Sequence, residues 1–521
     1  MVMLAGVNPL ELTVSDFGPI ARGRIELRPM TVFVGPSNTG KSYLAVLTYA
    51  LHQFLGSYPG NYAYRSNFDR MFISGLPAIM PTQGIDLSAD DVAVLNTWAQ
   101  ESRPRPETIL HTESSAQDSE LPLAIATLVR RVISGVGGVS EVLDSEIVRC
   151  FGIDKTENLI RHPNNAESHF TLRGKSTAKS GYSSSFQYDI ALAGQSFNID
   201  ASIPDAMPIG IGQNTFLPRL FWLTEPEGNE KQDNAHQILG WLARSALSHL
   251  VGPLGRPAHY LPADRVGVMH AHQVAVRGLI ASASRTALRR DSPMPVLSGV
   301  LGDFLEQLVS LASEPIFRER KGWGHDLALR LERELMGGAV RVERSQIDYP
   351  AFVYRPAGWR RDLPLMNASS MVSELAPVAL YLRHIVRPGD TLIIEEPESH
   401  LHPVMQVEFT RVLAAAVKSG VRILITTHSE WVLEELANLV LMSELSPNDR
   451  DGITSAELAL TPDEVGAWFF EPGVNGNGSV VKEMPLDKEL GNFPSGFGLI
   501  TADLYNRFAM ISNRIERIRE K

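Results

Sequence analysis

Short apolar runs alternate with helical stretches near the start of the chain and again in its last third. A fully apolar run ends just before a helical pattern in both regions, which is typical of buried strands that alternate with helices. Such strands form parallel sheets, so the pattern predicts an α/β fold with a mainly parallel sheet. The predicted strands are residues 24–28, 30–34, 391–394 and 421–426, and the predicted helices are residues 43–55, 372–386 and 403–417.

The middle of the chain has a different pattern. Residues 99–120 are polar and contain two prolines, which predicts a loop or a partly disordered segment. Helical stretches cover residues 121–139 and 235–250, and strand-like alternation occurs in three further segments. Those segments are residues 169–173, 185–192 and 197–203, with a predicted loop at 174–181 after the first. The simplest interpretation is one α/β core interrupted by a long α+β insertion.

This reading divides the chain into four segments. The first and third are the two halves of one head domain, and the second is the insertion. The last is a small C-terminal cap or partner-docking region with two predicted strands, 465–471 and 479–484, and a terminal helix, 501–519. The boundaries are 1–55, 56–255, 256–440 and 441–521.

Composition excludes several classes of protein. The 521 residues are 44% hydrophobic and 21% charged, which excludes wholesale disorder. The formal net charge of -11 argues against broad coating by nucleic acid, so any DNA contact would be local, for example at the loop 174–181 with Lys175 and Lys179. A single cysteine, Cys150, excludes an internal disulfide framework and a cysteine zinc site. No apolar run is long enough for a membrane span and no signal peptide is evident, so we expect a cytoplasmic protein without membrane contact.

Residues 35–42 read Gly-Pro-Ser-Asn-Thr-Gly-Lys-Ser and fit the phosphate-loop pattern G-x-x-x-x-G-K-[ST]. The backbone N–H groups of such a loop point at phosphate oxygens, and the following helix adds its positive end. Lys41 would reach the β- and γ-phosphates of ATP, and the Ser42 hydroxyl would bind Mg²⁺. The alternative is a glycine-bearing turn between a strand and a helix. The expected ATP ligands are Gly35, Asn38, Thr39, Gly40, Lys41 and Ser42.

Two acidic residues follow the predicted strand 391–394, at the edge where a parallel sheet presents side chains to a ligand. Glu395 would lie in the inner or outer coordination shell of Mg²⁺. Glu396 would orient and deprotonate the attacking water. His428 ends the next strand and could donate a hydrogen bond to the γ-phosphate or the water. The alternatives are a charged cap after a core strand and a structural histidine.

These motifs together resemble ABC-type P-loop ATPases. The resemblance rests on the phosphate loop, on Ile-Ile-Glu-Glu-Pro-Glu-Ser-His-Leu-His-Pro at 393–403 and on Thr-Thr-His-Ser at 426–429. The nearer relatives are the RecF-like, chromosome-maintenance and overcoming-lysogenization-defect (OLD) branches, which also share a segment similar to residues 260–265. The resemblance implies that two heads pair around ATP, so that a signature loop of one serves the nucleotide of the other. Ser370 occupies that signature position here, although the glycine of the family pattern is replaced by Met371.

The expected function is therefore that of an ATPase switch. The resemblance implies a homo-dimer or higher homo-oligomer joined through ATP, and control of a separate effector protein, a nuclease or a toxin, in anti-phage defence or DNA maintenance. A repair ATPase of RecF type and a weakly hydrolysing nucleotide sensor remain as alternatives.

Overall fold

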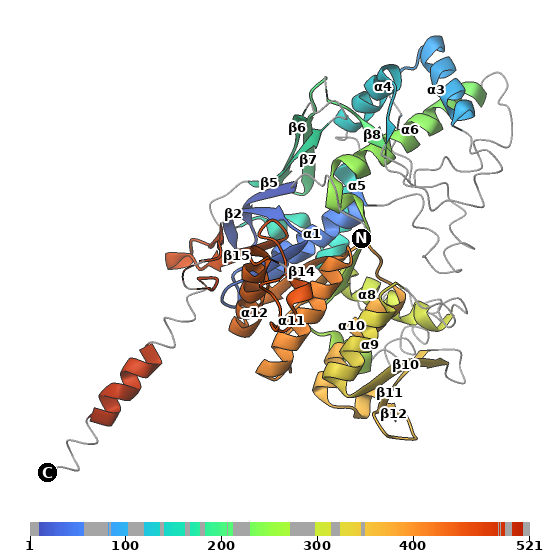
Figure 1. The fold of residues 1–521 in the computed structure, drawn as a ribbon. Helices are drawn as coiled ribbons and strands as arrows, with labels where there is room; N and C mark the ends of the chain where they lie inside the picture. Colours follow the sequence, from blue (N-terminus) through green and yellow to red (C-terminus); the bar gives the residue numbers. More distant parts are fainter. Residues whose placement is uncertain are drawn as a thin grey trace, which may run out of the picture.

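The computed structural model is dominated by one large sheet (Figure 1). It describes residues 10–56, 82, 85–102, 119–135, 140–161, 167–177, 183–205, 207–211, 230–270, 297–313, 323–344, 350–446, 448–487, 489, 491–494 and 503–513. The eleven strands are, in order across the sheet, β7 (Ser196–Ser202), β6 (Ser183–Ala193), β5 (Glu167–Thr177), β1 (Leu10–Phe17), β2 (Ile20–Leu27), β16 (Ser479–Glu483), β15 (Val465–Glu471), β3 (Met30–Val34), β14 (Arg422–Thr427), β13 (Thr391–Glu395) and β9 (Ala258–Leu261).

The α/β class predicted from the sequence is confirmed, but the sheet is mixed rather than mainly parallel. Among the described strands, five neighbouring pairs are parallel and five are antiparallel. The parallel block runs from β15 through β3, β14 and β13 to β9. On the other side, β1 and β2 and then β5 to β7 follow one another closely along the chain, and short connections join strands in antiparallel order.

Helices cover the two faces of the parallel block, and each face has its own apolar core. Side chains of α1 (Lys41–Leu55), α5 (Ser140–Phe151) and α6 (Glu230–Leu250) share one core. Side chains of α10 (Ser370–His384), α11 (Pro403–Lys418) and α12 (Glu430–Leu441) share the other. Alternation along each strand sends successive residues to opposite faces, so Ile393 contributes to the α1 core while Leu392 and Ile394 contribute to the other.

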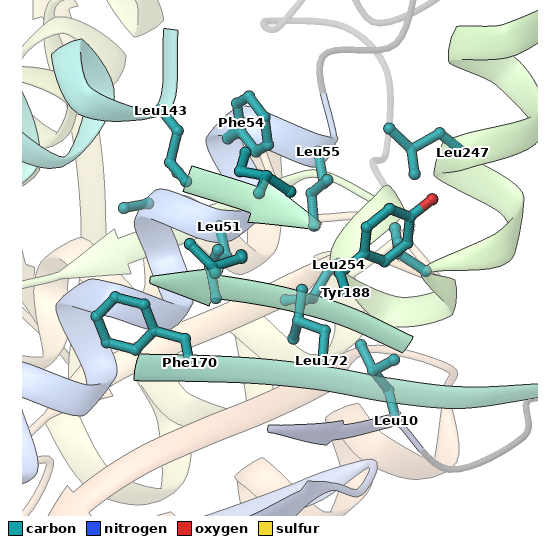
Figure 2. Close-up of a cluster of buried hydrophobic side chains, with 14 of the residues drawn as sticks. Leu10, Leu51, Phe54, Leu55, Leu143, Phe170, Leu172, Tyr188, Leu247 and Leu254 are labelled. Atoms are coloured by element: carbon teal, nitrogen blue, oxygen red, sulfur yellow. The ribbon is translucent and has the colours of Figure 1, made fainter. Parts of the chain in front are cut away.

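The predicted insertion is continuous with the head. Strand β5 pairs with β1, so the hairpin strands extend the main sheet. Figure 2 shows Leu51, Phe54 and Leu55 of α1 beside Phe170 and Tyr188 of these strands. Other described helices are α3 (Ala89–Glu101), α4 (Leu123–Ser134), α8 (Gly299–Ser313), α9 (His325–Arg330), the π-helix η8 (Leu331–Met336) and the helical stretches 265–270 and 503–513. The short 3-10 helices are η4 (Thr156–Leu159), η6 (Gly252–Gly255), η9 (Leu365–Asn367), η10 (Met442–Glu444), η11 (Ala456–Leu458) and η12 (Val474–Gly476). Outside the main sheet, β10 (Gly338–Arg344), β11 (Pro350–Pro356) and β12 (Leu363–Pro364) form a second sheet, and β4 (Ser119–Glu120) pairs with β8 (Gly210–Ile211).

Some predicted boundaries differ from the structure. The loop expected from residue 174 begins later, because β5 continues to Thr177 and pairs with β6 along its whole length. Lys179 and the rest of that loop, residues 178–182, lie outside the described residues, as do 103–118 of the predicted loop 99–120. The predicted helix 121–139 is α4, which ends at Ser134 before Gly135.

The predicted C-terminal cap contributes two strands to the centre of the sheet. Strand β15 is inserted beside β3, in parallel, and β16 pairs with β2. Strand β15 therefore lies directly beside β3, the strand that leads into the phosphate loop, and β16 lies between β15 and β2. Among the described residues, no helix is both long enough and apolar enough to cross a bilayer.

Buried His52 on α1 predicts a pH dependence of stability. Its Nδ1 lies 3.0 Å from the carbonyl oxygen of Arg256, and burial lowers the pKa of His52 from 6.5 to about 4. Between pH 6.5 and about pH 4 the unfolded chain takes up a proton on His52 that the folded chain does not. The free energy of unfolding therefore falls as the pH is lowered through this range. Between about pH 8 and about pH 5, we expect the free energy of unfolding to fall by about 2 kcal/mol less in His52→Gln than in the wild type. Urea unfolding at the two pH values measures this difference, and equal losses in both proteins would contradict it.

Candidate active site

The loop between β3 and α1 packs tightly against neighbouring strands and turns at two of its glycines. Gly35 and Gly40 have φ angles of 145° and 97°, in the region that favours glycine. A Cβ at Gly35 would lie 2.7 Å from the carbonyl oxygen of Phe470, and one at Gly40 would lie 2.6 Å from Ile20 Cγ1. Among the described residues no side chain caps α1 at Lys41, so its first N–H groups are available to a ligand.

Lys41 lies across this loop. It is buried, and its Nζ donates to the carbonyl oxygens of Gly35 at 2.9 Å and Pro36 at 2.7 Å. Burial lowers the pKa of Lys41, while the nearby carboxylates of Glu396 and Glu398 act in the opposite direction. The lysine is thus placed between the loop and the acidic edge of the sheet.

The other predicted loop residues differ in exposure. Asn38 has a positive φ of 62° and is exposed, and Ser42 is exposed in the first turn of α1. Thr39 is buried, and its hydroxyl donates to the carbonyl oxygen of Pro36 at 2.8 Å. Asn38 and Ser42 can therefore reach a ligand with their side chains, whereas Thr39 supports the loop and offers its backbone.

Glu395 ends β13 on the face that α1 covers. Its carboxylate accepts hydrogen bonds from the Tyr260 hydroxyl and, at 3.3 Å, from the N–H of Ala263. The Tyr260 ring meets Tyr49 of α1 edge-on at 5.3 Å. Burial raises the pKa of Glu395. Because both oxygens already accept hydrogen bonds from the chain, Glu395 is better suited to hold Mg²⁺ through water than directly.

Glu396 and His428 meet at the carboxyl ends of β13 and β14. Glu396 has a φ of 42°, unusual for a residue with a side chain, and its N–H donates to the carbonyl oxygen of Thr426 at 3.0 Å. Its Oε1 lies 3.9 Å from His428 Nε2, with 44% of the Glu396 side chain exposed. Burial and Lys41 lower the pKa of His428, which keeps the imidazole neutral at pH 7. A backbone held in this conformation is frequent at active sites.

Sequence reasoning gave Glu398 no role, although it is the third acid of the Glu-Glu-Pro-Glu run. Its Oε1 accepts from the N–H of His428 at 2.6 Å, which joins the ends of β13 and β14. Its Oε2 is buried and has no hydrogen-bond partner among the described residues. Burial raises the pKa of Glu398. An unpaired buried acceptor costs free energy unless a donor arrives with a ligand.

Arg265 is a second site residue that the sequence motifs do not predict, because residues 260–265 carry only a resemblance. Its side chain is 1% exposed and forms an ion pair with the equally buried Glu374 of α10. The guanidinium donates to the carbonyl oxygens of Glu395 at 2.6 Å and Glu396 at 3.2 Å. Arg265 therefore fixes the backbone that carries both acids and ties it to α10.

Ser370 is the first residue of α10, as the signature position requires. The cap is its neighbour Ser369, whose hydroxyl accepts from the N–H of Val372 at 3.3 Å. Both serines are exposed, and Met366 beside them is 64% exposed. Among the described residues, no hydrogen bond joins Ser370 to the phosphate loop of its own chain.

The hydrogen-bond donors and the lysine of this loop fit a nucleoside triphosphate with Mg²⁺. The loop conformation that its positive-φ glycines allow, the uncapped start of α1 and Lys41 fit phosphate oxygens. Among the described residues no group of three or more His, Cys, Asp or Glu could hold a metal alone. Mg²⁺ is usually bound through one or two carboxylates together with substrate phosphates. The Ser42 hydroxyl would bind Mg²⁺ together with the phosphates, and Glu395 would hold it through water.

Comparison with solved structures gave distant likenesses to chromosome-maintenance (SMC) heads. An SmcHead bound to the C-winged helix domain of ScpA is 8% identical with a TM-score of 0.39, over 92% of this chain and 98% of that one. The SMC head domain from Thermotoga maritima is 12% identical with a TM-score of 0.32, over 92% and 99%. An Smc head domain with an extended coiled coil, bound to the C-terminal domain of ScpA derived from Pyrococcus furiosus, is 10% identical with a TM-score of 0.38, over 92% and 97%.

A search among curated proteins gave no match. A family model described as an AAA ATPase domain matches residues 344–433. The matched segment contains Ser370, the two acids at the end of β13 and His428, and it does not include the phosphate loop. The part of the chain that presents the acidic edge of the site is thus similar to an AAA ATPase domain.

Proposed function

We propose that this chain is an ATP-hydrolysing switch that pairs with a second copy around ATP and controls a separate effector. The observation that carries the proposal is the meeting of phosphate-loop lysine, acid and histidine at one edge of the sheet. Glu396 Oε1 lies 3.9 Å from His428 Nε2, and Glu398 Oε1 accepts from the His428 N–H at 2.6 Å. The charges of Glu396 and Glu398 also raise the pKa of Lys41 against the effect of burial, as expected for carboxylates near a lysine.

Each group then has a distinct task in hydrolysis. The loop N–H groups and Lys41 hold and partly neutralise the phosphates. Glu396 is partly exposed and accepts a proton from the attacking water. Neutral His428 donates one hydrogen bond to the γ-phosphate or the water. Mg²⁺, when bound, would neutralise charge on the phosphate oxygens. Arg265 and Glu398 keep the ends of β13 and β14 in place.

Pairing of two chains is supported by the exposed start of α10. Ser370 faces solvent at a helix N-terminus, where a hydroxyl and N–H groups suit a phosphate. A helix start that makes no hydrogen bond to its own phosphate loop, within the described residues, can serve a nucleotide held by another chain. One ATP would then contact Lys41 of one copy and Ser370 of the other.

Mixing two inactive variants tests the shared site. We expect Lys41→Ala and Ser370→Arg each to hydrolyse little ATP alone. An equal mixture should recover about a quarter of wild-type turnover, because half of the pairs are mixed and each keeps one intact site. The matched surface control is Ser446→Arg, an exposed serine remote from α10 in sequence, which should keep wild-type turnover. Activity that stays near zero at every ratio, with mixed pairs confirmed by mass, would argue against shared sites.

Control of a separate effector is supported by exposed apolar side chains near the C-terminus. The helix at residues 503–513, drawn in red in Figure 1, exposes 59% of Leu504, 63% of Phe508 and 51% of Ile511. Clustered exposed apolar side chains mark interaction surfaces. We infer that an effector protein docks there, in a pathway of anti-phage defence or DNA maintenance.

The chain after residue 440 contains an Asp-x-Asp triplet, Asp449-Arg450-Asp451. Such a triplet would hold a nuclease metal if it stood at a strand end with a further acid. Here it lies in a turn, both aspartates are exposed, and the Asp449 carboxylate accepts from the Ser446 hydroxyl at 2.6 Å. This position favours an effector on another chain over a nuclease in this one.

A further inference from the structure

A cleft of about 560 Å³ opens beside the phosphate loop. One wall is formed by residues 37–39 of that loop together with Tyr43 in the first turn of α1. The other walls come from the β1–β2 turn at Pro19, from Asn158 and Arg161 of the predicted insertion, and from the connection between β15 and β16. Its volume lies within the range of small-molecule sites.

Hydrogen bonds hold these walls together. The Ser479 hydroxyl at the start of β16 donates to the carbonyl oxygen of Thr39 at 2.5 Å, and the Ser479 N–H donates to that of Pro19 at 2.8 Å. Arg161 Nη2 donates to the carbonyl oxygen of Gly476 at 2.5 Å. Segments far apart in the sequence are thus fixed around one cleft, which is a formed site and not a gap between loose loops.

The Arg161 guanidinium also lies against the backbone of the β15–β16 connection. A Cβ at Gly478 would be 2.3 Å from Arg161 Nε, and Gly478 has a φ of 65°. A side chain at position 478 would therefore displace the guanidinium. The close approach keeps the planar group of Arg161 in the wall of the cleft.

The cleft walls combine flat and polar surfaces. The Tyr43 ring is 39% exposed and packs edge-on against Phe17 at 6.1 Å. A Cβ at Gly18 would lie 2.6 Å from Tyr43 Cδ1, so the ring can take this position only because residue 18 has no side chain. Asn158 is exposed, and its side-chain amide makes no hydrogen bond among the described residues. Aromatic and guanidinium planes stack on nucleic-acid bases, and an amide can read a base edge.

We propose that this cleft holds the base and ribose of the nucleotide, and that Arg161 and Asn158 position the base. The inference rests on the proposed function. Its reason is continuity: residues 37–39 belong both to the cleft wall and to the loop that would hold the phosphates. A ligand with its phosphates in the loop would place its remaining part beside Tyr43. The base would then contact the insertion and the β15–β16 connection together.

Binding of ATP and of inorganic tripolyphosphate separates the nucleoside contribution from the phosphate contribution. By calorimetry on the full chain, we expect the wild type to bind ATP at least about tenfold more tightly than tripolyphosphate. Arg161→Ala and Asn158→Ala should each weaken ATP by about threefold to tenfold and leave tripolyphosphate within about twofold. Asn158→Ala removes an exposed amide and should leave the melting temperature unchanged. Arg173→Ala, an exposed arginine on β5 bonded to Gln187, is the control and should change neither affinity.

The outcomes distinguish this inference from the proposed function. Equal affinity of the wild type for ATP and tripolyphosphate would overturn the base site and leave a phosphate site in place. An equal loss of both ligands in Asn158→Ala would also overturn it, because the effect would not depend on the base. Failure of the wild type to bind either ligand would overturn both proposals.

Discussion

Glu396→Gln is expected to lower ATP turnover by about 10²–10⁴-fold while ATP affinity stays within about threefold. The amide has nearly the shape of the carboxylate but cannot take a proton from water. The backbone N–H of residue 396 still donates to the carbonyl oxygen of Thr426, because the substitution changes only the side chain. Phosphate release under saturating ATP and calorimetric titration with ATP measure the two quantities.

Glu430→Gln is a suitable control for this variant. Glu430 lies in the first turn of α12, two residues after His428. It makes none of the contacts given above for the site. It should keep wild-type turnover. Wild-type turnover in Glu396→Gln would show that Glu396 is not the base, and Glu395 would then become the candidate.

Lys41→Ala is expected to weaken ATP binding by about 100-fold or more, with a matching loss of turnover. The triphosphate would lose the cation that faces it most directly. The Nζ of the buried lysine also donates to the loop carbonyl oxygens of Gly35 and Pro36, so both carbonyls would lose the donor that they share. Calorimetry with ATP measures the loss.

The control for this variant is Lys418→Ala. Lys418 ends α11 and its Nζ lies 3.4 Å from Glu464, in a partly exposed ion pair of the kind that contributes little to stability. Its removal should change neither ATP affinity nor turnover. Unchanged ATP affinity in Lys41→Ala, in a protein with wild-type melting temperature, would contradict the assignment of the phosphate loop.

Local pattern was enough to predict the strands and turns that carry the site. Strand β3 is fully buried and apolar, and it ends at the phosphate loop as the motif requires. The helix after it begins at Lys41, two residues earlier than the apolar pattern indicated. The reason is that Lys41 and Ser42 are polar, so an apolar pattern does not include them in the helix.

Long-range pairing was beyond the reach of the pattern. The bounds of β15 were predicted, but an apolar run does not say which strand it joins, and its neighbour β3 lies far away in the sequence. The buried Arg265–Glu374 pair was missed for a similar reason. A lone arginine after a short strand and a lone glutamate in an apolar helix carry no signal until the fold brings them together.

The central claim is that two chains pair around ATP, and the mass of Glu396→Gln in solution with ATP and Mg²⁺ tests it most directly. That variant should bind ATP but not hydrolyse it, so the pair should stay together. Sedimentation should give twice the single-chain mass with ATP, and the smaller mass with ADP or in the Lys41→Ala, Glu396→Gln double variant. A mass that is the same with ATP, with ADP and in the double variant would contradict an ATP-bridged pair.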